Sequence, residues 1–147
     1  MEVICNSVEE TKKFASRLSK KFQKGQVIAL NGDLGSGKTT FSQGIAEGLG
    51  IEQHVGSPTF KLVSEYVGEV SKLYHVDCYR LNNADEFLNL GGENLLLPDN
   101  GITLIEWANI IQELLPEDVI EVVFSRIKEE PNKRLLKISG MDKSNEL

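Results

Sequence analysis

Residues 32–39 constrain the fold of this chain more than any other segment. They read Gly-Asp-Leu-Gly-Ser-Gly-Lys-Thr and match the phosphate-binding pattern G-x-x-x-x-G-K-[ST] at every position. An apolar run, Val27–Leu30, comes before the segment, and apolar side chains at helical spacing follow it from Phe41 to Leu49. The pattern therefore predicts a strand, a glycine-rich loop and a helix in that order, which is the context that a phosphate-binding loop requires.

The residue types in this loop suit the binding of a nucleotide. Glycines allow backbone N–H groups to curl around phosphates, and the helix that follows adds the positive end of its dipole. Lys38 is expected to reach the β- and γ-phosphates, and the Thr39 hydroxyl to help hold Mg²⁺. The predicted nucleotide-binding residues of this segment are Asp33, Leu34, Gly35, Ser36, Gly37, Lys38, Thr39 and Thr40.

The composition is that of one globular domain. The chain has 147 residues, of which 40% are hydrophobic and 26% charged, and a chain of this size can bury a substantial core. We predict a single domain over residues 1–140 and a flexible tail over residues 141–147. No apolar run is long enough to span a membrane and no signal peptide is visible, so a cytoplasmic protein without membrane contact is expected. Cys5 and Cys78 lack metal or redox spacing and are predicted to be thiols within strands.

The charge balance bears on the kind of partner that the chain can bind. The formal net charge is −6, whereas a protein that holds nucleic acid by its own phosphate contacts normally has a basic excess. One segment near the N-terminus is an exception, because it gathers Lys12, Lys13, Arg17, Lys20, Lys21 and Lys24. Two interpretations stay open: a solvated helix face, which we favour, or a docking strip for an acidic partner or an RNA edge.

The rest of the chain alternates between helical and extended patterns. Ser7–Glu10 has the form of a capping box, and Phe14, Leu18 and Phe22 follow at four-residue spacing. We predict helices over residues 8–24, within 83–97 and over 109–115, a hairpin of residues 60–67 and 72–77, strands over 102–105, 119–124 and 134–138, and a turn over 129–133. This order predicts a three-layer α/β fold whose mixed sheet has a parallel centre and an antiparallel portion.

Two predicted strands end in a carboxylate, and hydrolysis needs such groups near the metal. They are the strand ending at Asp77 and the strand ending at Glu106. Because the carboxyl ends of parallel strands meet at one edge of a sheet, both side chains could face the phosphate loop. Position alone leaves two alternatives equally open, since Asp77 also suits a turn and Glu106 also suits the first turn of the next helix.

Other polar residues are ambiguous when each is taken alone. Ser57 and Thr59 lie in a loop that could sense a γ-phosphate, but Ser-Pro-Thr is also a common turn, which we favour from these residues alone. His75 and Trp107 are more typical of packing than of catalysis. Arg80 could supply positive charge to a phosphoryl group or pair with a surface acid.

Taken together, several of these blocks resemble one known family. Gly32–Phe41, Ser57-Pro58-Thr59-Phe60, His75-x-Asp77-x-Tyr79-Arg80 and Glu106-Trp107 occur in this order along the chain. The combination resembles the TsaE family (also called YjeE), the small ATPases of bacterial tRNA threonylcarbamoyladenosine synthesis. The phosphate loop alone is generic, whereas the other blocks together are specific. The resemblance covers about residues 7–140.

The resemblance implies a P-loop NTPase fold, with ATP and Mg²⁺ as ligands. It implies catalytic roles for Lys38, Asp77 and Glu106, and it places Asp77 and Glu106 with Thr39 at the metal. The further positions that it implies are Trp107 and Thr11 near the nucleotide, a switch-like loop of Ser57, Pro58, Thr59 and Phe60, and site residues at His75, Tyr79 and Arg80.

The resemblance also implies partners. Members of the TsaE family act with TsaD and TsaB, which transfer threonylcarbamoyl to adenosine 37 of tRNAs reading codons that begin with A. ATP hydrolysis would then reset or activate the complex, and tRNA contact would be indirect. The acidic net charge of −6 agrees with this division of labour.

Three other classes of protein share the phosphate loop. A small-molecule or polynucleotide kinase usually needs an arginine-bearing lid, and the arginines at 17, 80, 126 and 134 suggest none. A GTPase would carry an Asn-Lys-x-Asp segment, whereas Asn132-Lys133 is followed by Arg134-Leu135. A nucleotide-regulated binding module with negligible turnover is the third alternative, and it partly merges with the ATPase prediction.

Overall fold

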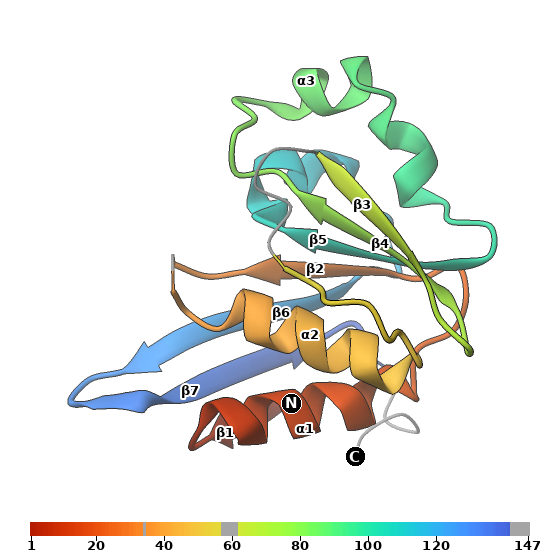
Figure 1. The fold of residues 1–147 in the computed structure, drawn as a ribbon. Helices are drawn as coiled ribbons and strands as arrows, with labels where there is room; N and C mark the ends of the chain where they lie inside the picture. The colour runs from red at the N-terminus through yellow and green to blue at the C-terminus, as the bar shows by residue number, and fades with distance from the viewer. Residues whose placement is uncertain (34, 57–61, 142–147) are drawn as a thin grey trace.

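The computed structural model describes residues 1–33, 35–56 and 62–141. Its described strands form one seven-stranded sheet in the order β1-β7-β6-β2-β5-β4-β3, with helices on both faces (Figure 1). The strands are β1 (Glu2–Cys5), β2 (Val27–Asn31), β3 (Val63–Val67), β4 (Lys72–Asp77), β5 (Gly101–Glu106), β6 (Ile120–Ile127) and β7 (Glu130–Ser139). The α-helices are α1 (Val8–Ser19), α2 (Lys38–Gly48) and α3 (Ala84–Asn89), and the 3₁₀ segments are η1 (Gly92–Leu96) and η2 (Ala108–Leu114).

The sheet is mixed, as the sequence predicted. Its centre is parallel, because β2 pairs in parallel with both β5 and β6, and β4 pairs in parallel with β5. The hairpins β3–β4 and β6–β7 and the edge strand β1 are antiparallel. All residues of β5 are buried, which is typical of a parallel strand covered on both faces. The carboxyl ends of β2, β4 and β5 therefore meet at one edge of the sheet.

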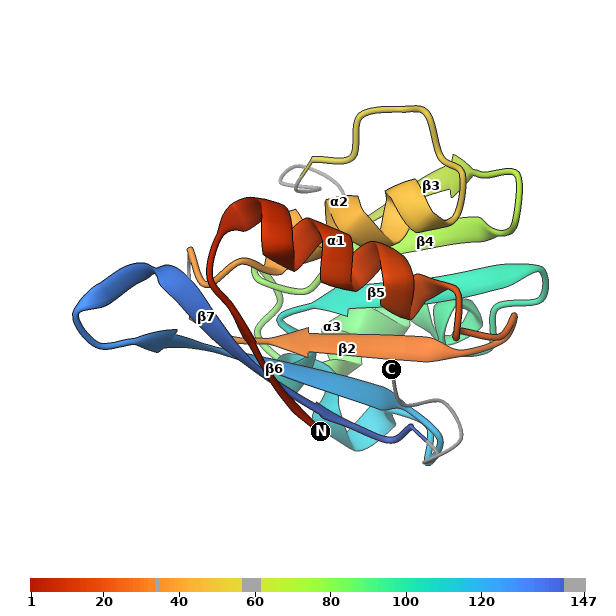
Figure 2. The same ribbon diagram turned by 90° about the horizontal axis from the view of Figure 1, so that it is seen from below.

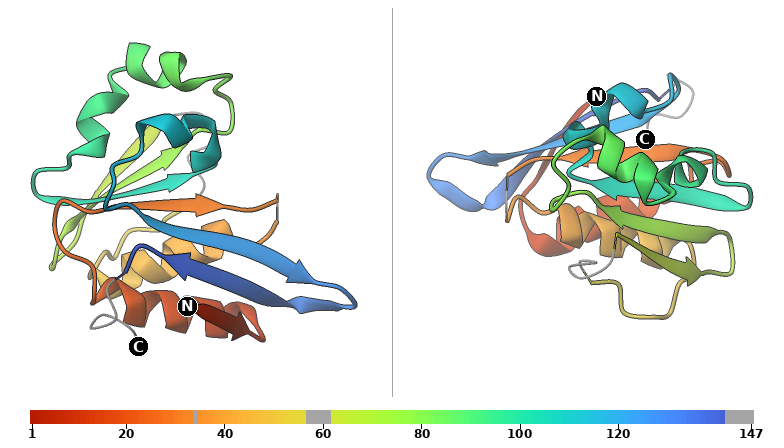
Figure 3. Two further views of the ribbon diagram at one scale, coloured as in Figure 1. Left: turned by 180° about the vertical axis from the view of Figure 1, so that it is seen from behind. Right: turned by 90° about the horizontal axis from the view of Figure 1, so that it is seen from above.

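Two apolar layers separate the sheet from its helices. On one face α1 and α2 lie side by side and bury Phe14, Leu18, Phe41 and Ile45 in one cluster (Figure 2). On the opposite face α3, η1 and η2 cover a second cluster that includes Phe87 (Figure 3). The three layers fix α2 against the centre of the sheet, and with it the loop that precedes this helix.

Helix α1 begins where the sequence predicted but ends earlier. Ser7 is its N-cap, and its side chain accepts a hydrogen bond from the Glu10 N–H. The α-helix ends at Ser19 instead of Lys24. The N–H groups of the next residues, Lys20 to Phe22, donate to carbonyls three positions back, which tightens the chain into a turn.

The β6–β7 hairpin differs from its prediction in register. The turn falls at Lys128 and Glu129, and Glu129 adopts a left-handed backbone with φ of 70°. Residues 130–133, predicted as a turn, belong to β7. Ile127 pairs with Glu130 while Arg126 pairs with Arg134, so residues 131–133 form a bulge in β7.

The other predicted helices and strands are present in outline, but Cys78, predicted to lie within a strand, follows the last residue of β4. The predicted helix over residues 109–115 is the 3₁₀ segment η2, which is kinked at Ile111. The predicted hairpin is β3–β4, of which residues 60–61 lie outside the described residues. The predicted flexible tail, apart from Met141, also lies outside them. Within the described ranges, no helix has the length and apolar character needed to cross a membrane.

Candidate functional site

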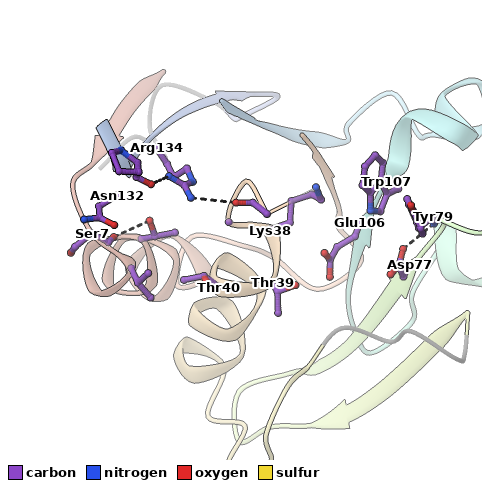
Figure 4. A pocket seen from close by; sticks show the side chains of 15 residues that line it. Ser7, Lys38, Thr39, Thr40, Asp77, Tyr79, Glu106, Trp107, Asn132 and Arg134 are labelled. Atoms are coloured by element: carbon purple, nitrogen blue, oxygen red, sulfur yellow. Dashed lines mark hydrogen bonds between the residues drawn. The ribbon is translucent and has the colours of Figure 1, made fainter. Parts of the chain in front are cut away.

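A cavity of about 350 Å³ lies at the carboxyl ends of β2, β4 and β5, beside the first turns of α1 and α2 (Figure 4). Its volume falls within the range of small-molecule sites. Lys38 lies between the arginine side of the cavity and the side that carries Glu106, Asp77 and Trp107. The lining residues are Ser7, Val8, Thr11, Gly35, Gly37, Lys38, Thr39, Thr40, Asp77, Tyr79, Glu106, Trp107, Pro131, Asn132 and Arg134.

The loop between β2 and α2 has the backbone of an anion-binding turn. Gly35 and Gly37 adopt left-handed conformations, with φ of 74° and 108°, which glycine adopts without steric cost. The Ser36 N–H donates to the Asp33 carbonyl at 3.0 Å and closes a turn within the loop. Gly37 is the N-cap of α2, so the unpaired N–H groups of the first helical turn open toward the cavity.

Lys38, the first residue of α2, is buried beneath the loop and beside an aromatic ring. Its Nζ donates to the Gly32 and Asp33 carbonyls, at 2.9 Å for Asp33, and lies 4.3 Å from the centroid of the Trp107 ring. Burial lowers the pKa of Lys38, and the nearby Glu106 carboxylate is the largest opposing influence. The ammonium group is therefore held against the carbonyl groups of the loop, and exchange of a carbonyl for a phosphate oxygen would give it a charged partner.

The two predicted carboxylates are neighbours at the sheet edge. Asp77 and Glu106 are register partners at the ends of β4 and β5. Asp77 also accepts a hydrogen bond from the Tyr79 N–H at 2.9 Å, so it closes a turn as well as lining the cavity. Both alternatives considered for Asp77 thus find support in the geometry.

Glu106 is held from behind by a histidine on β4. His75 Nε2 lies 2.5 Å from Glu106 Oε2, and both side chains are buried. If the Glu106 carboxylate is ionised it can only accept, and the Nε2 atom of His75 is then the donor of this hydrogen bond. Within the described part of the chain, His75 Nδ1 has no hydrogen-bond partner. His75 binds only one carboxylate oxygen of Glu106, so the other oxygen is available to the cavity that Glu106 lines.

The residue after Glu106 has an unusual backbone. Trp107 is left-handed, with φ of 58° and ψ of 39°, a conformation that costs energy for a bulky residue and often marks a functional site. This turn aims the indole at Lys38 and against Tyr79, whose ring centroid lies 4.9 Å away. The Trp107 ring, packed against Tyr79, therefore covers the lysine at one end of the cavity.

The structure brings most of the predicted site residues to this cavity. Those that line it are Thr11, Gly35, Gly37, Lys38, Thr39, Thr40, Asp77, Tyr79, Glu106 and Trp107. Asp33 and Ser36 belong to the loop but not to the lining, His75 lies behind Glu106, and Arg80 is exposed beyond β4. Leu34 and the predicted switch loop, Ser57 to Phe60, lie outside the described residues.

Sequence reasoning missed one wall of the cavity. Pro131 and Asn132 line it from the bulge in β7, and Arg134 lines it from the paired position that follows. The region was predicted as a turn followed by an ordinary strand, and no local pattern marks it as part of a site. Only the pairing of β7 with β6, next to β2, brings these residues to the loop.

The oxygen donors in the cavity fit Mg²⁺. The Thr39 hydroxyl and the carboxylates of Asp77 and Glu106 are hard ligands of the kind that Mg²⁺ selects. Over residues 1–33, 35–56 and 62–141, no group of three His, Cys, Asp or Glu side chains is placed to hold a metal alone. This donor set suits a metal that binds together with substrate phosphates, as in many phosphoryl-transfer sites.

A family model covers most of the chain. Residues 5–135 match the model described as "Threonylcarbamoyl adenosine biosynthesis protein TsaE". The matched stretch contains the phosphate loop, both carboxylates and the β7 bulge.

Individual relatives agree with the family model. A tRNA threonylcarbamoyladenosine biosynthesis protein TsaE from Bacillus subtilis is 44% identical over 118 residues, covering 80% of this chain and 73% of the relative. The protein of the same name from Rickettsia bellii is 40% identical over 140 residues and covers 95% and 94%. The crystal structure of YdiB from Bacillus subtilis superposes with a TM-score of 0.72 at 36% identity, covering 94% of this chain and 83% of that one.

Proposed function

The chain belongs to the TsaE family of tRNA threonylcarbamoyladenosine biosynthesis proteins, and from its site we propose that it is a Mg²⁺-dependent ATPase with a P-loop NTPase fold. One observation carries the proposal. A buried lysine, in a loop that matches the phosphate-binding pattern, lines a single cavity together with two adjacent carboxylates. Those are the groups that phosphoryl transfer from a nucleotide requires.

Each group in the cavity has a role in this proposal. The loop N–H groups and the Lys38 ammonium bind the phosphates of ATP and stabilise charge on the oxygens of the γ-phosphate. Thr39, Asp77 and Glu106 would hold Mg²⁺, which would neutralise charge on the phosphates. Asp77 and Glu106 also accept hydrogen bonds from the attacking water, and His75 fixes the Glu106 carboxylate in place.

Family membership supports a proposal about the setting of this activity. We propose that the chain acts in the cytoplasm with TsaD and TsaB in threonylcarbamoylation of adenosine 37, and that its partners hold the tRNA. The acidic net charge of −6 supports this part of the proposal, because a chain that bound tRNA alone would need a basic surface.

Paired measurements of binding and turnover test the roles of the carboxylates. Asp77→Asn and Glu106→Gln keep the shape of each side chain but remove its charge. We expect each to lower phosphate release from ATP about a hundredfold while ATP binding, measured by calorimetry, changes much less. Lys72→Ala is the control, because Lys72 is a half-buried residue of β4 whose side chain pairs with Glu65 and does not line the cavity.

The same assay separates hydrolysis from kinase activity. Phosphate release in the absence of any acceptor supports an ATPase. Unchanged turnover in both carboxylate variants would contradict the metal and catalytic roles, and transfer of phosphate only to an added nucleoside or sugar would indicate a kinase.

A further inference from the structure

The β6–β7 hairpin reaches the phosphate loop through one arginine. Arg134 Nε donates to the Ser36 carbonyl at 3.1 Å, and Arg134 Nη2 donates to the Gly35 carbonyl at 3.3 Å. Its remaining nitrogen, Nη1, donates to the Pro131 and Lys133 carbonyls at 2.6 and 2.8 Å. One guanidinium group therefore binds carbonyls of the loop and of the β7 bulge at once.

This contact matters because of how a phosphate loop is built. When its N–H groups turn inward toward an anion, its carbonyl groups turn outward and need other donors. The outward carbonyls of Gly35 and Ser36 belong to consecutive residues, and the planar fork of a guanidinium can bind both. A lysine in the same place could supply only a point charge on a flexible stem.

The rest of the Arg134 side chain and a second arginine support the same side of the loop. A Cβ atom built on Gly37 would lie 3.8 Å from Arg134 Cγ, so the aliphatic stem runs beside the end of the loop. A Cβ atom built on Gly35 would meet the Nη2 atom of Arg126, which is the register partner of Arg134 on β6. The hairpin thus covers the outer side of the loop.

The bulge in β7 is tied to the loop by the same side chain. Residues 131–133 are the extra residues of the bulge, and Pro131 and Asn132 line the cavity. Since Arg134 binds carbonyls on both sides of Asn132, it fixes this wall relative to the loop. A movement of the loop would therefore move the wall as well.

We propose that Arg134 is a positioning residue that holds the phosphate loop in its phosphate-binding shape and links it to the cavity wall formed by the β7 bulge. It acts through the loop carbonyls and not as a catalytic residue. The inference rests on the proposed binding of ATP at this site.

Calorimetric binding of Mg·ADP to the full chain tests the inference. We expect Arg134→Gln, which loses the charged fork, to weaken ADP binding about tenfold, and Arg134→Lys to fall between it and the wild type. The matched control is Lys133→Gln on the same bulge, because the Lys133 side chain pairs with Glu130 and does not line the cavity. This control should bind ADP as the wild type does.

Hydrogen exchange without nucleotide gives an independent measurement. Arg134→Gln should speed exchange at the Ser36 amide while exchange in the β3–β4 hairpin stays unchanged. Equal ADP affinity of Arg134→Gln and the wild type, equal weakening by Lys133→Gln, or unaltered exchange at Ser36 would each overturn the inference. A wild-type chain that fails to bind ADP would instead contradict the proposed function, while the exchange measurement would still decide the role of Arg134.

Discussion

The buried contact between His75 and Glu106 is the residue pair on which the site geometry depends most. Their side chains are 0% and 4% exposed. Loss of the His75 donor would leave the buried Glu106 carboxylate without its hydrogen-bond partner, and an uncompensated buried carboxylate typically costs about 3 kcal/mol or more. The cost should therefore appear as lost stability as well as lost activity.

His75→Phe tests this pair directly. We expect it to lower the free energy of unfolding by about 3 kcal/mol or more in urea titrations. The control is His54→Phe, since His54 is exposed, and it should change stability by less than about 0.5 kcal/mol. Similar stabilities of the two variants would mean that His75 does not compensate the Glu106 carboxylate.

The burial of the two cysteines predicts slow reaction of their thiols with alkylating reagents. Both thiols are free and buried. Burial raises the pKa of Cys5 above its ordinary value of 9.0, and it raises the pKa of Cys78 to about 12. Because the thiolate is the reactive form, alkylation at pH 8 should be at least about a hundredfold slower in the native chain than in denaturant.

The same pKa shifts set the direction of the pH dependence of stability. The unfolded chain releases the Cys78 proton near pH 9.0, whereas the folded chain keeps it until about pH 12. The contribution of the Cys78 thiol to the free energy of unfolding is therefore complete below pH 9.0 and is lost as the pH rises toward about 12.

Mass spectrometry after alkylation checks the burial of both thiols. Fast alkylation of the two cysteines in the native chain would contradict their burial.

At this scale, what could be predicted depended on whether the signal was local. The position of Lys38 and Thr39 in the cavity lining could be predicted, because they belong to a contiguous pattern that fixes its own backbone. The position of Arg134 could not, because its contact with Ser36 joins residues 98 positions apart. Its place depends on strand pairing and on a bulge, which no short window of residues encodes.

At the scale of elements, helix α2 approaches α1 closely at two glycines. A Cβ atom built on Gly44 would lie 2.5 Å from the Lys12 carbonyl oxygen and 2.7 Å from Ala15 Cβ. At Gly48 it would lie 2.6 Å from the Ser16 carbonyl oxygen. Since the phosphate loop leads into α2, this contact helps to set where the loop lies on the sheet.

Gly44→Ala separates helix propensity from packing. Propensity alone predicts a gain of about 1 kcal/mol, because alanine is the better helix former. We expect instead a net loss of about 1–3 kcal/mol in urea unfolding, because the added methyl group meets the backbone of α1. Glu47→Ala is the control, since it removes only an exposed pair at 3.8 Å with Lys12, and should cost less than about 1 kcal/mol. A stabilised Gly44→Ala variant would show that the helices separate easily.

The elements themselves were more predictable than their ends. The start of α1 could be predicted because Ser7 supplies a cap. Its end could not, because residues 20–24 have good helix propensity, and the turn there depends on contacts with residues far along the chain. One of these joins the Gly25 N–H to the Gly101 carbonyl at 2.8 Å. The 3₁₀ geometry of η2 is likewise a tertiary effect, because the N–H of Asn109 is bound by Asn31 from β2 at 2.8 Å.

At the scale of the whole molecule, the charge of −6 predicts weak binding of tRNA. At about 0.15 M salt, we expect the chain alone to bind tRNA more weakly than about 10⁻⁴ M in fluorescence anisotropy. Tighter binding that falls steeply with added salt would contradict this expectation. It would direct attention to the exposed basic residues of the N-terminal segment, such as Lys13 and Arg17.

The central claim is that this chain hydrolyses ATP as a subunit of the tRNA-modification machinery. The most direct measurement is Mg²⁺-dependent phosphate release from ATP by the chain alone and with a purified TsaB–TsaD pair. We expect slow release by the chain alone and a sharp rise with the pair, both lost in Lys38→Ala. Release that does not respond to the pair, or phosphate that appears only on an added acceptor, would contradict it.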